Sequence, residues 1–194
     1  MWNEQIIMML LEGIKDTLYM TLTSTLIGYV IGLPMGILLT VTDKDGIHPN
    51  AAVYKVLDVI ANLIRSVPFL ILLIVLIPFT RFLIGRSYGP TATIVPLVIA
   101  AAPYIARMVE SSLKEVDAGV IEAARSMGAS NFTIVTKVML VEARTSLIVG
   151  ATISLGTILG YSAMAGTVGG GGLGDIAIRY GYTRWQTDIM IDRK

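Results

Sequence analysis

The chain has 194 residues, of which 54% are hydrophobic and only 15% charged, and its formal net charge is +1. Its mean hydropathy of +0.72 lies far above that of a soluble domain. A nearly neutral chain offers nucleic acid no electrostatic attraction, and the absence of Cys excludes disulfide frameworks and thiolate metal sites. We therefore expect an all-α integral membrane protein embedded in the lipid bilayer.

The first predicted span covers residues 17–41, which carry no charge and exceed the roughly 20 helical residues needed to cross a bilayer. Gly28, Gly32 and Gly36 recur at every fourth position, so they share one helix face that a second helix can approach closely. Pro34 predicts a kink. The preceding segment lacks the basic start and the cleavage site of a signal peptide, so we expect the span to remain in the protein.

The second predicted span covers residues 56–80 and carries charges only in its first half, at Asp58 and Arg65. Pro68 and Pro78 predict bends. We interpret both charged residues as cytoplasmic anchors whose side chains snorkel to the membrane surface, and a role in a substrate pathway is the alternative.

The third and fourth predicted spans cover residues 87–106 and about 143–165. The charges that follow residue 106 predict the end of the third span there. The glycine-rich sequence after residue 165 is predicted to be a loop, followed by an interfacial aromatic segment. Only residues 189–191 indicate a fifth span.

The segment 107–142 is too polar to cross a membrane, and Lys and Arg are enriched there and in the loop at 42–56, which places both in the cytoplasm. The segment predicts a helical hairpin. Asp117 can cap a first helix that Gly128 ends in a left-handed conformation, and Ser130 or Asn131 can cap a second helix.

The first hairpin helix is rich in small residues. Ala124 and Gly128 share a face with Ala123 beside them, and Glu122 and Arg125 can pair at the i, i+3 spacing. A flat patch of this kind buries little area unless another body presses against it, which favours a docking helix. The alternative is an amphipathic connector packed on its own bundle.

The stretch "EAARSMGAS" resembles the EAA motif of bacterial ABC-importer permeases, whose coupling helix sits in a groove of a cytoplasmic ATPase. The resemblance assigns ATPase coupling to Glu122, Ala123, Ala124 and Gly128. Further along, the family has a hydrophobic residue, a Leu and a Pro. This chain matches with Val138 and Leu140 but has Val141 in place of the Pro, which removes one expected cause of a local bend.

Two further stretches, "RSVPFLILL" and "GYSAMAGTVGGGGLGDIAIRYGY", resemble the methionine-uptake branch of these permeases over essentially the whole chain. The resemblance implies a multi-pass protein of the bacterial inner membrane with one transmembrane domain over residues 1–194. It also implies a homodimer with two ATP-binding subunits and an extracytoplasmic methionine-binding protein. The branch has five spans with the N-terminus outside, whereas this sequence shows four and passes from "QTDIMI" to "DRK".

Tyr161, Ser162 and Met164 in the fourth span are candidate pathway residues, because small neighbours could leave a cavity for an apolar amino-acid side chain. Ordinary helix packing is the alternative interpretation.

Other chemistry finds little support in the sequence. The glycines at 169–174 match G-x-G-x-x-G but follow a membrane helix rather than a strand, and no P-loop motif occurs, so any ATP must be bound by a partner. His48 lies near Asp43 and Asp45, but one His without further ligands indicates a solvated turn. We expect no catalytic residue, metal or cofactor in this chain.

Three alternatives to a methionine importer remain at this point. One is an importer for another amino acid or small solute, and one is a secondary transporter or channel that needs no ATPase. The third, a membrane enzyme, would need clustered intramembrane His or carboxylates, and the sequence shows none.

Overall fold

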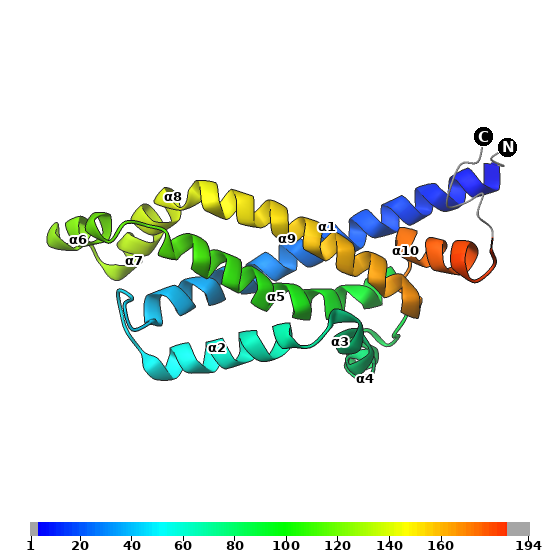
Figure 1. Ribbon diagram of the computed structural model, residues 1–194, viewed down its shortest axis with the longest axis horizontal. Helices are drawn as coiled ribbons and strands as arrows, with labels where there is room; N and C mark the ends of the chain where they lie inside the picture. Colours follow the sequence, from blue (N-terminus) through cyan, green and yellow to red (C-terminus); the bar gives the residue numbers. More distant parts are fainter. Residues whose placement is uncertain (1–3, 186–194) are drawn as a thin grey trace. The chain divides into compact units, whose positions relative to one another are not determined.

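The computed structural model describes residues 4–185, and every regular element in that part of the chain is helical (Figure 1). The predicted all-α fold is confirmed. The chain divides into two compact units. Among the described residues, the terminal unit takes its residues from 4–26, 67–99 and 155–185, and the hairpin unit from Ile27–Ser66 and Ala100–Ser154. The three long helices, α1 (Glu4–Thr42), α5 (Pro90–Lys114) and α9 (Arg144–Ala165), contribute residues to both.

The terminal unit adds five short elements to its parts of the long helices. These are α3 (Phe69–Val75), α4 (Ile77–Ile84), a 3-10 turn (Gly166–Val168), α10 (Gly172–Ile176) and a π-helical segment (Ala177–Tyr182). Met20, Leu97 and Ile158, one from each long helix, have no exposed surface and form the centre of its core. Thr17 Oγ1 accepts a hydrogen bond from the backbone N–H of Leu173 at 2.9 Å, which fixes the start of α10 on α1.

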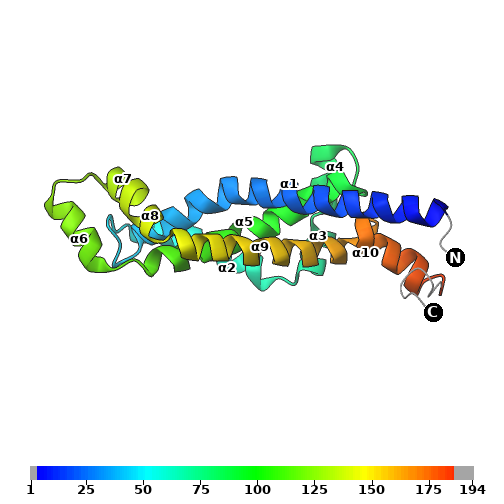
Figure 2. The same cartoon turned by 90° about the horizontal axis from the view of Figure 1, so that it is seen from above.

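The hairpin unit adds α2 (Ala51–Ser66) and the elements of the hairpin. These are α6 (Ala118–Ser126), α7 (Asn131–Thr133), a π-helical segment (Ile134–Met139) and α8 (Leu140–Glu142). Leu39, Ile105 and Ile134 are fully buried in its core. Two perpendicular views show α6 beyond the last turn of α5, at the end of this unit (Figures 1 and 2).

The glycine face predicted on the first span packs against α5, within the hairpin unit. A Cβ atom on Gly32 would lie 2.6 Å from the carbonyl oxygen of Ala102, so no larger residue fits there without moving the backbone. The helix continues through Pro34 to Thr42, and it begins at Glu4, well before the predicted start of the span.

Three helical stretches of the described residues are long and apolar enough to cross a membrane: Glu4–Thr42, Pro90–Lys114 and Arg144–Tyr182. A fourth span is obtained if α2 and α3 together form one crossing, which agrees with the four predicted spans. The prediction of one helix over residues 56–80 is wrong in detail, because the helix ends at Ser66 and Pro68 caps the start of α3. Pro78 lies in the first turn of α4, where a missing N–H costs nothing.

Two other boundaries differ from the prediction. α5 does not end at residue 106 but continues to Lys114, because its charged residues pair with one another and with neighbours. The glycine-rich segment after residue 165 is mostly short helical turns rather than loop, with only residues 169–171 outside them. The predicted hint of a fifth span at residues 189–191 lies outside the described residues.

Candidate functional site

The first hairpin helix, α6, forms where the capping residues predict it. An Asp117 side-chain oxygen accepts a hydrogen bond from the backbone N–H of Gly119 at 2.7 Å and so caps the N-terminus. At the other end Gly128 has φ +83°, and the N–H of Ala129 reaches back to the carbonyl of Ala124 at 3.1 Å. Ser130, rather than Asn131, caps the second helix by accepting from the N–H of Thr133. The predicted hairpin is confirmed.

The four residues assigned to coupling do not share one surface. Ala124 is only 5% exposed, so it faces the bundle, whereas Glu122, Ala123 and Gly128 are exposed. The expectation that Ala124 and Gly128 form one free flat face is therefore corrected: Ala124 faces inward, and α6 packs against the π-helical segment of the hairpin's second arm.

Large apolar side chains stand out from the same hairpin. Met127 is 81% exposed and Phe132 is 77% exposed. Together with Glu122, Ala123 and Gly128 they make up what we name the exposed hairpin surface. A polar loop that displays a methionine and a phenylalanine to solvent, beside small residues, has the features of a contact surface for another protein.

Arg125 does not form the predicted pair with Glu122. Its Nη2 atom instead donates a 2.8 Å hydrogen bond to the backbone carbonyl of Ile47, in the loop between α1 and α2. Arg125 and Glu122 both line a groove of about 490 Å³ whose opposite wall is this loop. α6 is therefore attached to a segment that lies far from it in the sequence.

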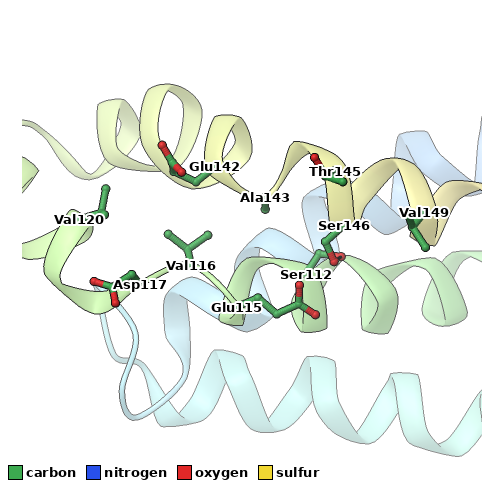
Figure 3. Close-up of a pocket in the computed structure, with 10 residues that line it drawn as sticks. All are labelled: Ser112, Glu115, Val116, Asp117, Val120, Glu142, Ala143, Thr145, Ser146 and Val149. Carbon is green, nitrogen blue, oxygen red and sulfur yellow. Dashed lines mark hydrogen bonds between the residues drawn. The ribbon is translucent and has the colours of Figure 1, made fainter.

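A second groove, of about 570 Å³, lies where α5, α6 and α9 meet (Figure 3). Ser146 donates a hydrogen bond to Ser112 at 3.0 Å across it, and Glu115, Asp117 and Glu142 contribute carboxylates to its walls. Figure 3 shows the carboxylates of Asp117 and Glu142 apart from one another. Within the described residues no cluster of His, Cys, Asp and Glu could hold a metal ion.

A chain of charged side chains crosses the hairpin unit. Lys114 Nζ lies 2.6 Å from an Asp43 carboxylate oxygen and 2.8 Å from Glu110, and Arg107 lies 2.7 Å from Glu110. Arg107 also binds Asp58 on α2. The hydrogen bond from Lys114 lowers the pKa of Asp43 below its ordinary value. We name these five residues the charge chain.

Sequence reasoning missed the charge chain, although it left a signal. Arg107, Glu110 and Lys114 are spaced i, i+3, i+7 with alternating sign, which puts them on one face of a helix. Asp58, predicted to be a snorkelling anchor, is instead paired with Arg107, while Arg65 is exposed.

The three candidate pathway residues point in different directions. Tyr161 stacks on Phe69 with ring centroids 4.5 Å apart, and Ser162 is buried and donates to the carbonyl of Leu159 at 2.8 Å. Met164 is 50% exposed. Their assignment to a pathway remains a prediction.

The G-x-G-x-x-G glycines serve backbone conformation at Gly169 and Gly171, which have positive φ, and close backbone packing at Gly174. A Cβ atom on Gly174 would collide with the backbone of Ala163, and one on Gly166 would collide with the backbone of Gly174. His48 is an exposed residue of the loop after α1, where its N–H donates to the carbonyl of Val41 at 3.0 Å.

Comparison with known proteins agrees with this arrangement. Residues 9–189 match the family described as "Binding-protein-dependent transport system inner membrane component". The chain is 47% identical to the probable D-methionine transport system permease protein MetI of Vibrio cholerae, over 94% of this chain and 81% of that protein. It is 51% identical to the D-methionine transport system permease protein MetI of Escherichia coli K12, over 84% of this chain and 76% of that protein.

Solved structures give the same relationship. A structure of the MetNI methionine ABC transporter in an inward-facing conformation superposes with a TM-score of 0.93 at 48% identity, covering 97% of this chain and 89% of that one. An amino acid ABC transporter crystallised with histidines, at 22% identity and a TM-score of 0.74, shares the fold. The chain therefore belongs to the family of binding-protein-dependent transport system inner membrane components, as a multi-pass transport subunit of the inner membrane.

Proposed function

We propose that this chain is the permease subunit of an ATP-binding-cassette importer for methionine. The observation that carries the proposal is the superposition, at 48% identity and a TM-score of 0.93, on a methionine ABC transporter. Relatives named as D-methionine permeases, about half identical over most of their length, support the same cargo. In this role residues 1–194 act as one transmembrane domain with a cytoplasmic coupling region at about 107–142.

The energy for uptake comes from a separate ATPase, because the sequence has no P-loop to hold the phosphates of ATP. The exposed hairpin surface is the part that docks on this ATPase. Ala123 and Gly128 give the ATPase close access to the helix, Glu122 presents an exposed carboxylate, and Met127 and Phe132 supply apolar area. Ala124, on the buried face of α6, allows this helix to pack against the second arm of the hairpin.

Two copies of the chain enclose the pathway, and each copy docks on one ATPase subunit. Closure of the two ATPases moves the docked helices as rigid bodies and switches the pathway between outward and inward openings. An extracytoplasmic binding protein delivers methionine. Tyr161, Ser162 and Met164 remain candidates for contact with the substrate, and Met164 is the most accessible of the three.

The test is uptake of labelled methionine into proteoliposomes that hold the permease, its ATPase and its binding protein. We expect uptake to require ATP and to be abolished both by excess unlabelled methionine and by Glu122→Arg, which places a bulky charge of the wrong sign on the docking helix. The matched control is Glu12→Arg, which reverses an exposed carboxylate in the terminal unit and should leave uptake unchanged.

Each alternative predicts a different result. A secondary transporter would take up methionine without ATP, would lose uptake when ionophores collapse the ion gradients, and would ignore Glu122→Arg. An importer for another solute would hydrolyse ATP with its binding protein, yet unlabelled methionine would not compete for uptake.

A further inference from the structure

The attachment of α6 to the α1–α2 loop provides a route by which a movement of α6 can reach α2. Through the backbone α6 is connected to α5 on one side and to the hairpin's second arm and α9 on the other. α2, by contrast, is not adjacent to α6 along the backbone. The hydrogen bond from Arg125 to the carbonyl of Ile47 is a direct contact between α6 and the segment that leads into α2.

The loop that receives Arg125 is itself well ordered by hydrogen bonds. The N–H of Gly46 donates to the carbonyl of Asp43 at 2.9 Å, that of His48 to Val41 at 3.0 Å, and that of Asn50 to Thr42 at 2.9 Å. A loop that is tied to the end of α1 at two points and closed on itself at a third moves as one piece, so a displacement at Ile47 is passed on rather than absorbed.

The same loop is fastened to α5 and α2 by the charge chain. Asp43 in the loop binds Lys114, Lys114 binds Glu110, Glu110 binds Arg107, and Arg107 binds Asp58 on α2. The Glu110 side chain is only 7% exposed. Its buried charge is tolerated because Arg107 and Lys114 pair with it on both sides. A further hydrogen bond of 3.0 Å joins Arg107 to Asn62 on α2.

Apolar packing holds α2 only weakly, because Ala61 is the buried residue among its 16. Polar contacts with Arg107 therefore make up much of what fixes this helix within the hairpin unit, and they are specific in geometry because a guanidinium binds in fixed directions.

We propose that Arg125 and Asp43 are positioning residues that couple the docking helix to α2, through the α1–α2 loop and the charge chain. This inference rests on the proposed function, since it assumes that an ATPase moves α6. Arg125 passes that movement to the loop at Ile47, and Asp43 passes it to Lys114 and onward to α2. Neither residue contacts substrate or ATP in this role.

The first experiment measures methionine uptake and ATP hydrolysis in parallel on the intact reconstituted complex. Arg125→Ala removes the contact to Ile47. Asp43→Asn removes the charge that Lys114 pairs with, while Glu110 keeps both of its partners. We expect each variant to assemble and to hydrolyse ATP, but methionine moved per ATP to fall about threefold to tenfold. Arg125→Lys, which keeps a donor, should recover part of the loss.

The double variant decides whether the two residues act along one connection. If they do, Arg125→Ala with Asp43→Asn lowers uptake per ATP no further than either single change, because the connection is already cut. Lys137→Ala, which alters an exposed cation of the same hairpin, is the control and should have no effect. Unchanged uptake per ATP in Arg125→Ala, or losses that multiply in the double variant, would overturn the proposal.

A second measurement does not depend on the cargo. The chain contains no Cys, so Lys55→Cys provides a single site on α2 for a spin label, and the distance between labels on two copies can be measured with and without trapped ATP. We expect an ATP-dependent change that Arg125→Ala and Asp43→Asn greatly reduce. A change that persists in both variants contradicts the inference. Failure of methionine uptake beside the expected label result would refute only the proposed cargo.

Discussion

Two glycine repeats of the same spacing differ in their surroundings: the repeat on α1 is tightly packed and the repeat on α9 is not. On α1, Gly28, Gly32 and Gly36 are pressed against α5, and a Cβ atom on Gly36 would lie 2.5 Å from the carbonyl oxygen of Ala106. On α9, Gly156 and Gly160 meet nothing: a Cβ atom on either would have no neighbour within 4 Å.

The difference lies in the partner and not in the repeat. On α5 the side chains of Ala101, Ile105 and Val109 lie against the α1 glycines, and so do the backbone carbonyls of Ala102 and Ala106. The repeat on α9 has no such complement within the described chain and remains open. A glycine repeat thus indicates that a helix can be approached closely, but it does not say whether the partner belongs to the same chain. Under the proposed function, the open repeat is available to the second copy.

The largest effect is expected from a substitution in the glycine repeat of α1, which is packed against α5. Gly32→Leu must displace the carbonyl of Ala102 and the side chain of Ile105, and overpacking against backbone costs about 3 kcal/mol or more. We expect the variant to lose most of its folded yield, measured by size-exclusion chromatography and thermal melting after extraction from the membrane. A variant that melts within a few degrees of the parent would show that α1 and α5 are not closely packed.

A smaller effect is expected at Gly156 and Gly160 on α9, where a larger side chain has room within the chain. Gly156→Leu has room within the chain, and replacing a helical glycine gains up to about 1 kcal/mol of helix propensity. The melting temperature of the single chain should therefore hold or rise, while pairing of two copies should weaken. Light scattering in detergent measures the pairing. Equal losses of folded yield in Gly156→Leu and Gly32→Leu would remove the distinction between the two repeats.

The smallest expected effect is a pH dependence of stability that arises from the Asp43–Lys114 ion pair, which lies where α1 and α5 end. The ion pair with Lys114 lowers the pKa of Asp43 below 3.8 in the folded chain. A lowered carboxyl pKa adds stability that is complete above the unfolded value and disappears as pH falls through the folded value. We expect the difference in melting temperature between the parent and Asp43→Asn to be constant from pH 7 to about pH 5 and to shrink below pH 3.8. A difference already lost at pH 5 would contradict this assignment.

Local signals in the sequence were sufficient for the hairpin. Asp117, Gly128 and Ser130 define its helix ends because a cap depends on a few adjacent residues and the backbone between them. The long apolar stretches were equally clear, since crossing a membrane requires length and composition alone.

Features that depend on distant partners could not be predicted in the same way. The inward position of Ala124 follows from what lies beneath α6, and the partner of Arg125 is a backbone carbonyl 78 residues away. The continuation of α5 past residue 106 was missed because isolated charges usually end a span, whereas Glu110 is neutralised by neighbours that only the fold supplies.

The contact of Gly166 and Gly174 with neighbouring backbone determines which substitutions this end of α9 can accept. Where backbone touches backbone, every side chain is excluded alike, whether polar, charged or apolar, because even the first carbon of the side chain has no space. Natural variants and designed libraries should therefore exchange one apolar side chain for another on the lipid-facing helices, where charges are costly, yet keep glycine at these two positions. In the "GGGG" stretch beside them, Gly169, Gly171 and Gly172 have positive φ, and a Cβ atom on Gly170 would lie 2.7 Å from the carbonyl oxygen of Ala165. Backbone conformation and close packing therefore account for these glycines without a ligand.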